Sequence, residues 1–311
     1  MATIVLVHGI NNQRESADLI ESSWLPALAG GIRVAGRGDL ADRIWPQRTW
    51  ADGISCRVAY YGDLFRSPDQ QGGGADLRDL TPEQTALADV LALEWLERVA
   101  DRAPVGSQDA DQARLALEIA RESERVQAQG RGNDWREAIK TLARVSWIAN
   151  AGMSVAERFV PSLAQVSRYL TDESIRSKAR KSVLDLIDAD TSVIIGHSLG
   201  SVVAYECAHM LDQPLPLLVT LGSPLGLRTI VTERLIPPAS FPPMAGVWLN
   251  VANREDIIAA EPDLCPLFGN GVPPGSRFEG NKFEECSEDP HRAETYLGRA
   301  RLGREVIEVL N

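Results

Sequence analysis

A serine held between two glycines, directly after a short apolar run, constrains the fold of this chain most. The apolar run covers residues 192–195, Gly196-His197-Ser198-Leu199-Gly200 follows, and a helical pattern begins at Val202. A sharp turn from strand to helix strains the backbone of the central serine and projects its hydroxyl above the sheet. Side chains at the flanking positions would collide with the neighbouring strand and helix, which explains the glycines. The pattern predicts a nucleophilic serine, although a glycine-rich turn without chemistry has the same pattern.

Four further runs have the character of strands that are buried on both faces. They are rich in Val, Ile and Leu without clear alternation, and they cover residues 3–7, 54–60, 217–221 and 247–251. Helical patterns lie between the runs, at 15–28, 174–187, 202–211 and 292–310. This alternation of strands and helices predicts an α/β domain with a mainly parallel sheet flanked by helices.

One long stretch, from about residue 64 to residue 171, has almost no strand signal. A Gly-rich joint at 70–74 precedes a helix start, where Thr81 is the expected N-cap, Pro82 the first helical residue and Gln84 the partner in a capping box. Further helices are expected at 111–127, 133–150 and 155–169. We therefore predict a core made of 1–63 and 172–311, with a helical insertion at 64–171 as its cap or lid.

A serine hydroxyl is a weak nucleophile until a base takes its proton, and the chain has four histidines. His197 is adjacent to Ser198 and its side chain should diverge from the hydroxyl. His209 lies about three helical turns farther along the chain. His8 belongs to the loop after the first strand, which is expected to form part of an oxyanion site. His291, just before the last helical pattern, is therefore the predicted base.

A carboxylate should hold this histidine, and it should follow a strand that comes after the serine. The run at 247–251 is such a strand, and Asp256 follows it closely. Asp256 is the predicted acid, with Glu255 as the near alternative and Asp263 as a distant one.

An oxyanion site requires one backbone N–H just after the serine and a second from a loop after an early strand. Leu199 supplies the first. The loop after the first strand, His8-Gly9-Ile10-Asn11, supplies the second, from either Ile10 or Asn11. Gly9 allows the turn, and His8 is expected to order the loop through hydrogen bonds.

With these residues placed, the chain resembles the α/β-hydrolase superfamily, and within it the serine esterases and lipases. Four motifs carry the resemblance: Leu6-Val7-His8-Gly9, the pentapeptide at 196–200, Leu221-Gly222-Ser223-Pro224, and residues 250–256. The resemblance covers 1–63 and 172–311, without the helical insertion and without the usual early antiparallel hairpin. It implies an α/β-hydrolase fold and acyl transfer to water through an acyl-enzyme, with no cofactor.

The expected function is therefore a serine hydrolase that cleaves carboxylic esters, with a small-molecule ester or a lipid as substrate. Acyltransferase, thioesterase and peptidase activities use the same residues and stay open. A binding or signalling module that has lost catalysis is the alternative outside enzymes.

Composition narrows the partners. A net charge of -11 argues against nucleic acid and against anionic lipid surfaces. No apolar stretch reaches the ~18 residues of a membrane span, so no stable membrane insertion is expected. The N-terminus lacks a basic region and a cleavage site, and the four cysteines lack C-x-x-C spacing, which together favour a cytoplasmic protein with reduced thiols.

Overall fold

A six-stranded parallel sheet organises the structure, a computed structural model that describes residues 3–45, 53–66, 80–102, 108–127, 155–256, 258–259, 261–285 and 289–310. The strand order is β2-β1-β3-β4-β5-β6, and every neighbouring pair is parallel. The strands are β1 (Ile4–Val7), β2 (Cys56–Ala59), β3 (Val193–His197), β4 (Leu215–Leu221), β5 (Ala245–Ala252) and β6 (Arg277–Phe283).

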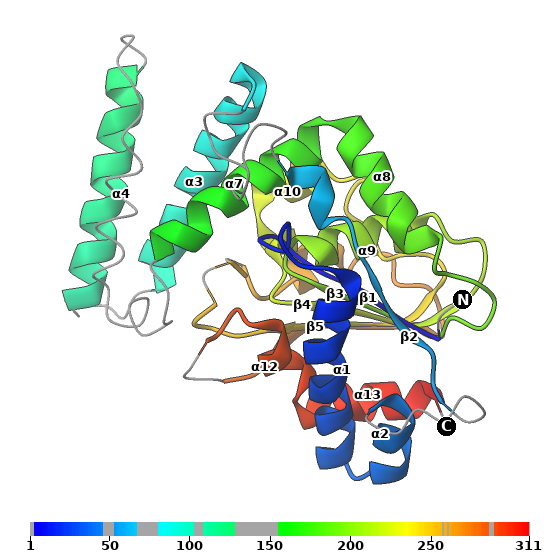
Figure 1. The fold of residues 1–311 in the computed structure, drawn as a ribbon. Helices are drawn as coiled ribbons and strands as arrows, with labels where there is room; N and C mark the ends of the chain where they lie inside the picture. Colours follow the sequence, from blue (N-terminus) through cyan, green and yellow to red (C-terminus); the bar gives the residue numbers. More distant parts are fainter. Residues whose placement is uncertain are drawn as a thin grey trace.

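Helices flank both faces of this sheet (Figure 1). One face carries α1 (Ala17–Val34), α2 (Gly38–Ile44), α12 (Ala293–Leu297) and α13 (Ala300–Leu310). The other face carries α8 (Glu173–Leu184), α9 (Leu199–His209) and α10 (Arg228–Glu233), and the short helix α11 (Cys265–Phe268) lies before β6. The chain thus belongs to the α/β class.

Alternating side chains of the strands supply the two halves of the core. Val5 and Val7 of β1 pack with α9, whereas Ile4 and Leu6 pack with α1 and α13 on the opposite face. This alternation follows from the two-residue period of a strand. Because both faces are covered, every residue of the strand is apolar, and all four are fully buried.

All five predicted strands are present, and the structure adds a sixth. The sequence of β6, Arg-Phe-Glu-Gly-Asn-Lys-Phe, is polar and mostly half-buried, because this strand lies at the edge of the sheet. Edge strands need little apolar sequence, so the run gave no signal. The helical pattern at 292–310 divides into α12 and α13, with Gly298 and Arg299 between them.

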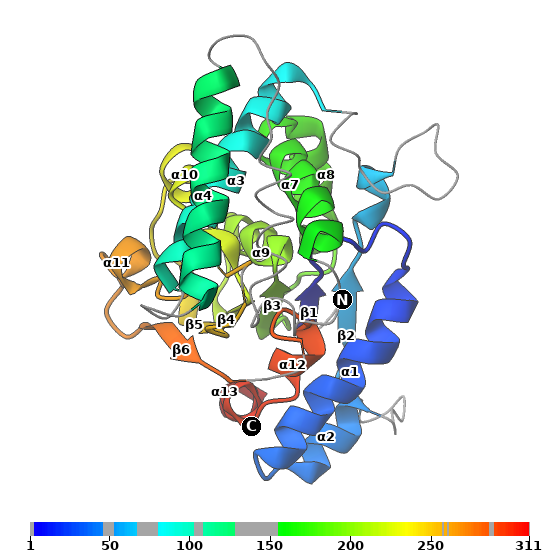
Figure 2. The same cartoon turned by 90° about the vertical axis from the view of Figure 1, so that its left-hand side faces the viewer.

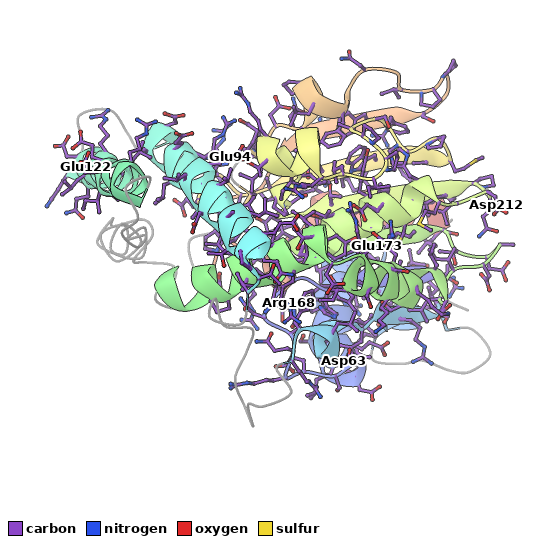
Figure 3. The ribbon with its side chains drawn as sticks, turned by 90° about the horizontal axis from the view of Figure 1, so that it is seen from above. Asp63, Glu94, Glu122, Arg168, Glu173 and Asp212 are labelled. Atoms are coloured by element: carbon purple, nitrogen blue, oxygen red, sulfur yellow. The ribbon has the colours of Figure 1, made fainter. Side chains whose placement is uncertain are left out.

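In the described part of the stretch between β2 and β3, three α-helices precede α8. They are α3 (Pro82–Arg102), α4 (Gln108–Gln127) and α7 (Val155–Thr171). Helix α3 packs against α4, α7 and α10 (Figure 2), and α4 lies farthest from the sheet (Figures 1 and 3). The expected capping box at Thr81 and Gln84 is present, with reciprocal bonds of 3.0 and 3.2 Å. The expected helix at 133–150 and the Gly-rich joint at 70–74 lie outside the described residues.

Within the described part of the chain, no helix combines the length and the apolar sequence that crossing a membrane requires.

A buried polar cluster joins the last helix of the insertion to the core. Tyr169 of α7 donates a hydrogen bond of 2.6 Å to Glu206 of α9. Arg176 of α8 donates to both carboxylate oxygens of Glu206, one at 3.0 Å, and to the carbonyl of Arg234 at 2.6 Å. The side chains of Arg176 and Glu206 are 4% and 0% exposed, so neither charge has water as an alternative partner.

Replacing Arg176 with Met should therefore lower the free energy of unfolding by about 3 kcal/mol, because the buried charge of Glu206 then keeps only the more distant Arg180, at 3.9 Å. Urea unfolding measures the difference. The matched control is Lys181→Met, which breaks an exposed i,i+4 pair with Asp185 and should cost less than about 1 kcal/mol. Equal effects of the two substitutions would contradict this prediction.

Candidate active site

Three side chains from separate elements meet above the carboxyl edge of the sheet. Ser198 follows β3, Asp256 follows β5, and His291 lies in the loop before α12. His291 Nε2 lies 3.0 Å from Ser198 Oγ, and His291 Nδ1 lies 2.9 and 2.8 Å from the two carboxylate oxygens of Asp256. The structure thus brings together the predicted nucleophile, base and acid in one chain of hydrogen bonds.

The backbone of Ser198 has the strain that the glycine pattern predicts. Its φ of 55° and ψ of -131° lie outside the regions that non-glycine residues favour. A Cβ atom at Gly196 would lie 2.6 Å from the Cα of Ser201, and one at Gly200 would collide with the carbonyl oxygens of Val7 and His8. Both glycines are therefore required sterically, and α9 begins at Leu199 with its N-terminus at the serine.

The carboxylate of Asp256 is fully buried and has several donors. Tyr296 Oη donates to it at 2.8 Å, and the backbone N–H groups of Ile258 and Ala259 donate at 2.9 and 3.3 Å. Burial alone would raise the pKa of Asp256, but the facing imidazole of His291 and the hydrogen bonds from His291 and Tyr296 lower it below its ordinary value. The group is therefore ionised at neutral pH and fixes the proton of His291 on Nδ1.

His197 contacts both the backbone and the ring of His291. Its Nε2 lies 2.7 Å from the carbonyl oxygen of His291, and the two rings lie 4.7 Å apart. Because a carbonyl only accepts, Nε2 of His197 carries the proton. Burial, followed by the nearby His291, lowers the pKa of His197 to about 3, so this ring is neutral and holds the loop of His291 by a hydrogen bond.

The loop after β1 packs directly onto the serine. A Cβ atom at Gly9 would lie 2.5 Å from Ser198 Cβ, so only glycine fits there. His8 accepts a hydrogen bond from Tyr61 N at 3.1 Å through Nε2, and its Nδ1 lies 2.7 Å from Gly9 O. Both ring nitrogens are thus occupied in ordering the loop, as expected. Burial lowers the pKa of His8 to about 4 and keeps it neutral.

The two candidate donors of this loop differ in their surroundings. The backbone N–H of Asn11 donates to Gln165 Oε1 of α7 at 3.1 Å. The N–H groups of Ile10 and Leu199 have no hydrogen-bond partner among the described residues. Of the two predicted donors, Asn11 is thus the one whose N–H is engaged by another residue.

The loop after β4 completes the floor of the site. Gly222 has a φ of +51°, and a Cβ atom there would lie 2.7 Å from Asp256 Oδ2 and 3.3 Å from His291 Nδ1. The motif Leu221-Gly222-Ser223-Pro224 thus turns beneath the acid–base pair, which explains the glycine within it.

A narrow apolar pocket opens at the serine. Its free volume is about 10 Å³, roughly the room of one water. Helices α3 and α7 of the insertion form one wall and α10 with its flanking residues forms the other. The lining residues are Ile10, Leu91, Trp95, Leu163, Val166, Ser198, Leu199, Pro224, Leu227, Ile230 and Ile258.

The remaining candidates from the sequence have other partners. Glu255 is exposed, and its backbone N–H donates to Asn253 at 2.8 Å. Asp263 accepts from Cys265 N at 2.9 Å and caps the short helix there. His209 Nε2 lies 3.3 Å from Ser240 O. None of these three contacts Ser198 or His291 in the hydrogen bonds of the described residues.

Sequence reasoning missed three side chains that contact the site or its loops, namely Tyr296, Gln165 and Arg102. Tyr296 lies on α12, five residues beyond His291. The apolar pattern of this helix predicts only that Tyr296 is a buried aromatic residue. Gln165 and Arg102 lie on helices of the insertion and reach residues 154 positions away. In the described ranges, no three His, Cys, Asp or Glu side chains are grouped to hold a metal ion.

Comparisons with protein-family models, curated proteins and solved structures gave no match to this chain.

The two neutral histidines predict a pH dependence of stability. In the unfolded chain His8 and His197 bind a proton below pH ~6.5, whereas in the fold they stay neutral down to about pH 4 and 3. The unfolded state thus binds more protons, so stability falls as the pH falls from 6.5 towards 4. Each of the two histidines should lower the free energy of unfolding by about 2 kcal/mol at pH 5.0 relative to pH 7.5. Urea unfolding at the two pH values measures this difference.

The variant His8→Gln isolates one contribution. Its free energy of unfolding should change by about 2 kcal/mol less between the two pH values than that of the wild type. An unchanged pH dependence in this variant would show that His8 does not titrate as its burial requires.

Proposed function

We propose that this chain is a serine hydrolase of the α/β-hydrolase type, which cleaves short-chain carboxylic esters through an acyl-enzyme on Ser198. The observation that carries the proposal is the continuous hydrogen-bond chain from Ser198 through His291 to the buried Asp256. The order of the three residues along the sequence, serine, acid, histidine, is the order associated with this fold. The parallel sheet and the strained turn at Ser198 support the same assignment.

The position of the site within the sheet adds support. From β1 the chain continues to β2, which pairs with one edge of β1. It then returns to β3, which pairs with the opposite edge, so the direction in which strands are added reverses between β1 and β3. Open α/β sheets bind ligands at the carboxyl ends of the strands where such a reversal occurs. Ser198 and the loop of Gly9 lie at this point.

In the proposed reaction, His291 Nε2 takes the proton of Ser198 as Oγ forms a bond to the ester carbonyl carbon. The negative charge that develops on the carbonyl oxygen is stabilised by the N–H groups of Leu199 and Ile10. His291 then gives the proton to the leaving alcohol as its C–O bond breaks. Water repeats the sequence on the acyl-enzyme and releases the acid, and Asp256 stabilises the imidazolium in both halves.

The proposal predicts covalent labelling of Ser198 by a fluorophosphonate, because the hydroxyl is activated by His291. Mass spectrometry of the labelled peptide locates the adduct. Ser198→Ala should give no adduct and no hydrolysis of p-nitrophenyl acetate. A wild-type protein that folds but acquires no label would leave the non-catalytic binding module as the better reading.

Replacing Asp256 with Asn should lower kcat for p-nitrophenyl acetate by a factor on the order of 10³ to 10⁴, because the amide no longer fixes the required tautomer of His291. The control is Glu255→Gln, which changes the exposed neighbouring carboxylate and should leave kcat within about twofold. A large loss in the control and none at position 256 would reverse the assignment of the acid.

The narrow apolar pocket supports short acyl groups as substrates. Trp95 of α3 fills one wall and is 2% exposed, so Trp95→Leu should enlarge the pocket. The ratio of kcat/KM for p-nitrophenyl octanoate to that for the acetate should rise about tenfold or more, since each methylene in such a pocket contributes about 1 kcal/mol. Val90→Ala on the same helix changes an exposed side chain and should leave the ratio unchanged. A ratio unaffected by Trp95→Leu would place the acyl group elsewhere.

A further inference from the structure

Two side chains of the helical insertion reach loops of the core that carry reacting groups. Arg102, the last residue of α3, donates through Nη1 to the carbonyl oxygen of Asp256 at 3.0 Å and through Nη2 to that of Ala259. Gln165, in the middle of α7, accepts from the backbone N–H of Asn11 at 3.1 Å. The first contact holds the loop of the acid, and the second holds the loop of Ile10.

The contact of Gln165 is buried and specific. Its side chain is 1% exposed, and its Nε2 donates to Gln13 Oε1 at 3.3 Å, in the same loop that it holds through Asn11. Asn11 has a φ of 64°, a conformation that few non-glycine residues adopt and that needs support from its surroundings. By accepting from the N–H of Asn11, Gln165 fixes the Ile10–Asn11 peptide, and this peptide directly follows the one that carries the N–H of Ile10.

The contact of Arg102 carries charge as well as geometry. The charge of its guanidinium interacts with Asp256, and also with Glu261, Tyr296 and Arg98. The carboxylate of Asp256 is faced in addition by His291, His197 and Tyr296 from other elements. The planar fork of an arginine can hold two carbonyl oxygens at once, which an ammonium group cannot do in the same geometry. Removing Arg102 would therefore loosen the acid loop and take a positive charge from beside the acid–base pair.

The helix that bears Arg102 is itself fixed to the core by further polar contacts. Glu94 accepts from the N–H groups of Arg228 and Thr229 at the start of α10, at 2.5 and 3.0 Å. Arg98 pairs with Glu261 at 3.2 Å. These contacts follow one face of α3 down to Arg102, so this helix is anchored along its length over the pocket.

We propose that the insertion is a fixed catalytic scaffold, in which Gln165 positions the loop of Ile10 and Arg102 positions the loop of Asp256. The proposal rests on the proposed hydrolase function. Neither side chain touches the reacting atoms, so both are positioning residues. The alternative is that α3 and α7 only cover the pocket, and that their polar contacts merely contribute to folding.

The experiment measures kcat, KM and the pH profile for p-nitrophenyl acetate, together with the rate of fluorophosphonate labelling. Arg102→Met should lower kcat about tenfold to a hundredfold with little change in KM, because the acid loop is displaced. The acid limb of its profile should move to higher pH, since the loss of the positive charge beside Asp256 favours uptake of a proton by the acid–base pair. Arg102→Lys keeps the charge, so its acid limb should stay in place while kcat falls.

Gln165→Leu should lower kcat and the labelling rate about tenfold or more without moving the acid limb, because it disturbs only the oxyanion loop. Gln165→Glu keeps an oxygen acceptor for Asn11 and should restore most of the rate. If Arg102→Met or Gln165→Leu does not fold, the variants Arg102→Lys and Gln165→Glu still test the proposal. A kcat of Arg102→Lys equal to that of the wild type overturns the proposal. A kcat of Gln165→Glu at or below a tenth of the wild-type value also overturns it.

The matched control is Arg98→Met, which removes a cation from the same face of α3 but no contact to a carbonyl of the acid loop. It should stay within about threefold of the wild type with an unmoved acid limb. Losses in Arg98→Met equal to those in Arg102→Met would mean that general docking of α3 is responsible, and the proposal fails. A wild type that is labelled at Ser198, with Arg102→Met and Gln165→Leu as fast as it, overturns this inference alone. A wild type that is not labelled overturns the hydrolase function as well.

Discussion

The close approach of β1 to the turn after β3 is the constraint on which the rest of the structure depends. The two strands pair in parallel register, with Val7 opposite Gly196, so both chains leave the sheet at the same place. The backbone of Gly200 then passes against the carbonyl oxygens of Val7 and His8, where no side chain fits. This crowding strains Ser198 and at the same time sets the loop of Gly9 beside it. One packing contact therefore brings together Ser198 and the loop of Gly9, the proposed nucleophile and the proposed oxyanion loop.

Burial explains how four histidines come to have different roles. His8 and His197 are nearly inaccessible and each faces a backbone carbonyl, so the neutral ring is favoured and acts as a fixed donor. His291 instead lies between a hydroxyl and an ionised carboxylate, and its ring is partly open to solvent. It alone has a partner that favours its charged form and a group whose proton it can take. The neighbours of His8 and His197 thus make them structural imidazoles, whereas those of His291 suit the role of the proposed base.

The sequence predicted what local patterns encode, and it missed what only distant packing creates. Buried parallel strands, the glycines around Ser198 and the capping box at Thr81 are all written in adjacent residues. Asp256 and His291, which meet in the structure, were predicted from their positions after a strand and before the last helix. The edge strand β6 lacked an apolar run, and the choice between Ile10 and Asn11 required the position of Gln165. Arg102 and Gln165 look like any polar residues on a solvated helix, because their partners lie 154 residues away.

Helices α3 and α7 line the apolar pocket with Leu91 and Leu163 and also carry the side chains that reach the loops of the core. Under the proposed function, substitutions that admit a bulkier substrate would fall on the same two helices that position the loops of Ile10 and Asp256. Specificity and turnover would then be inherited together, and exchanging the insertion between related chains would transmit both traits or neither. In a fold whose pocket-lining helices do not contact the loops of the reacting groups, substrate specificity could change without a change in turnover.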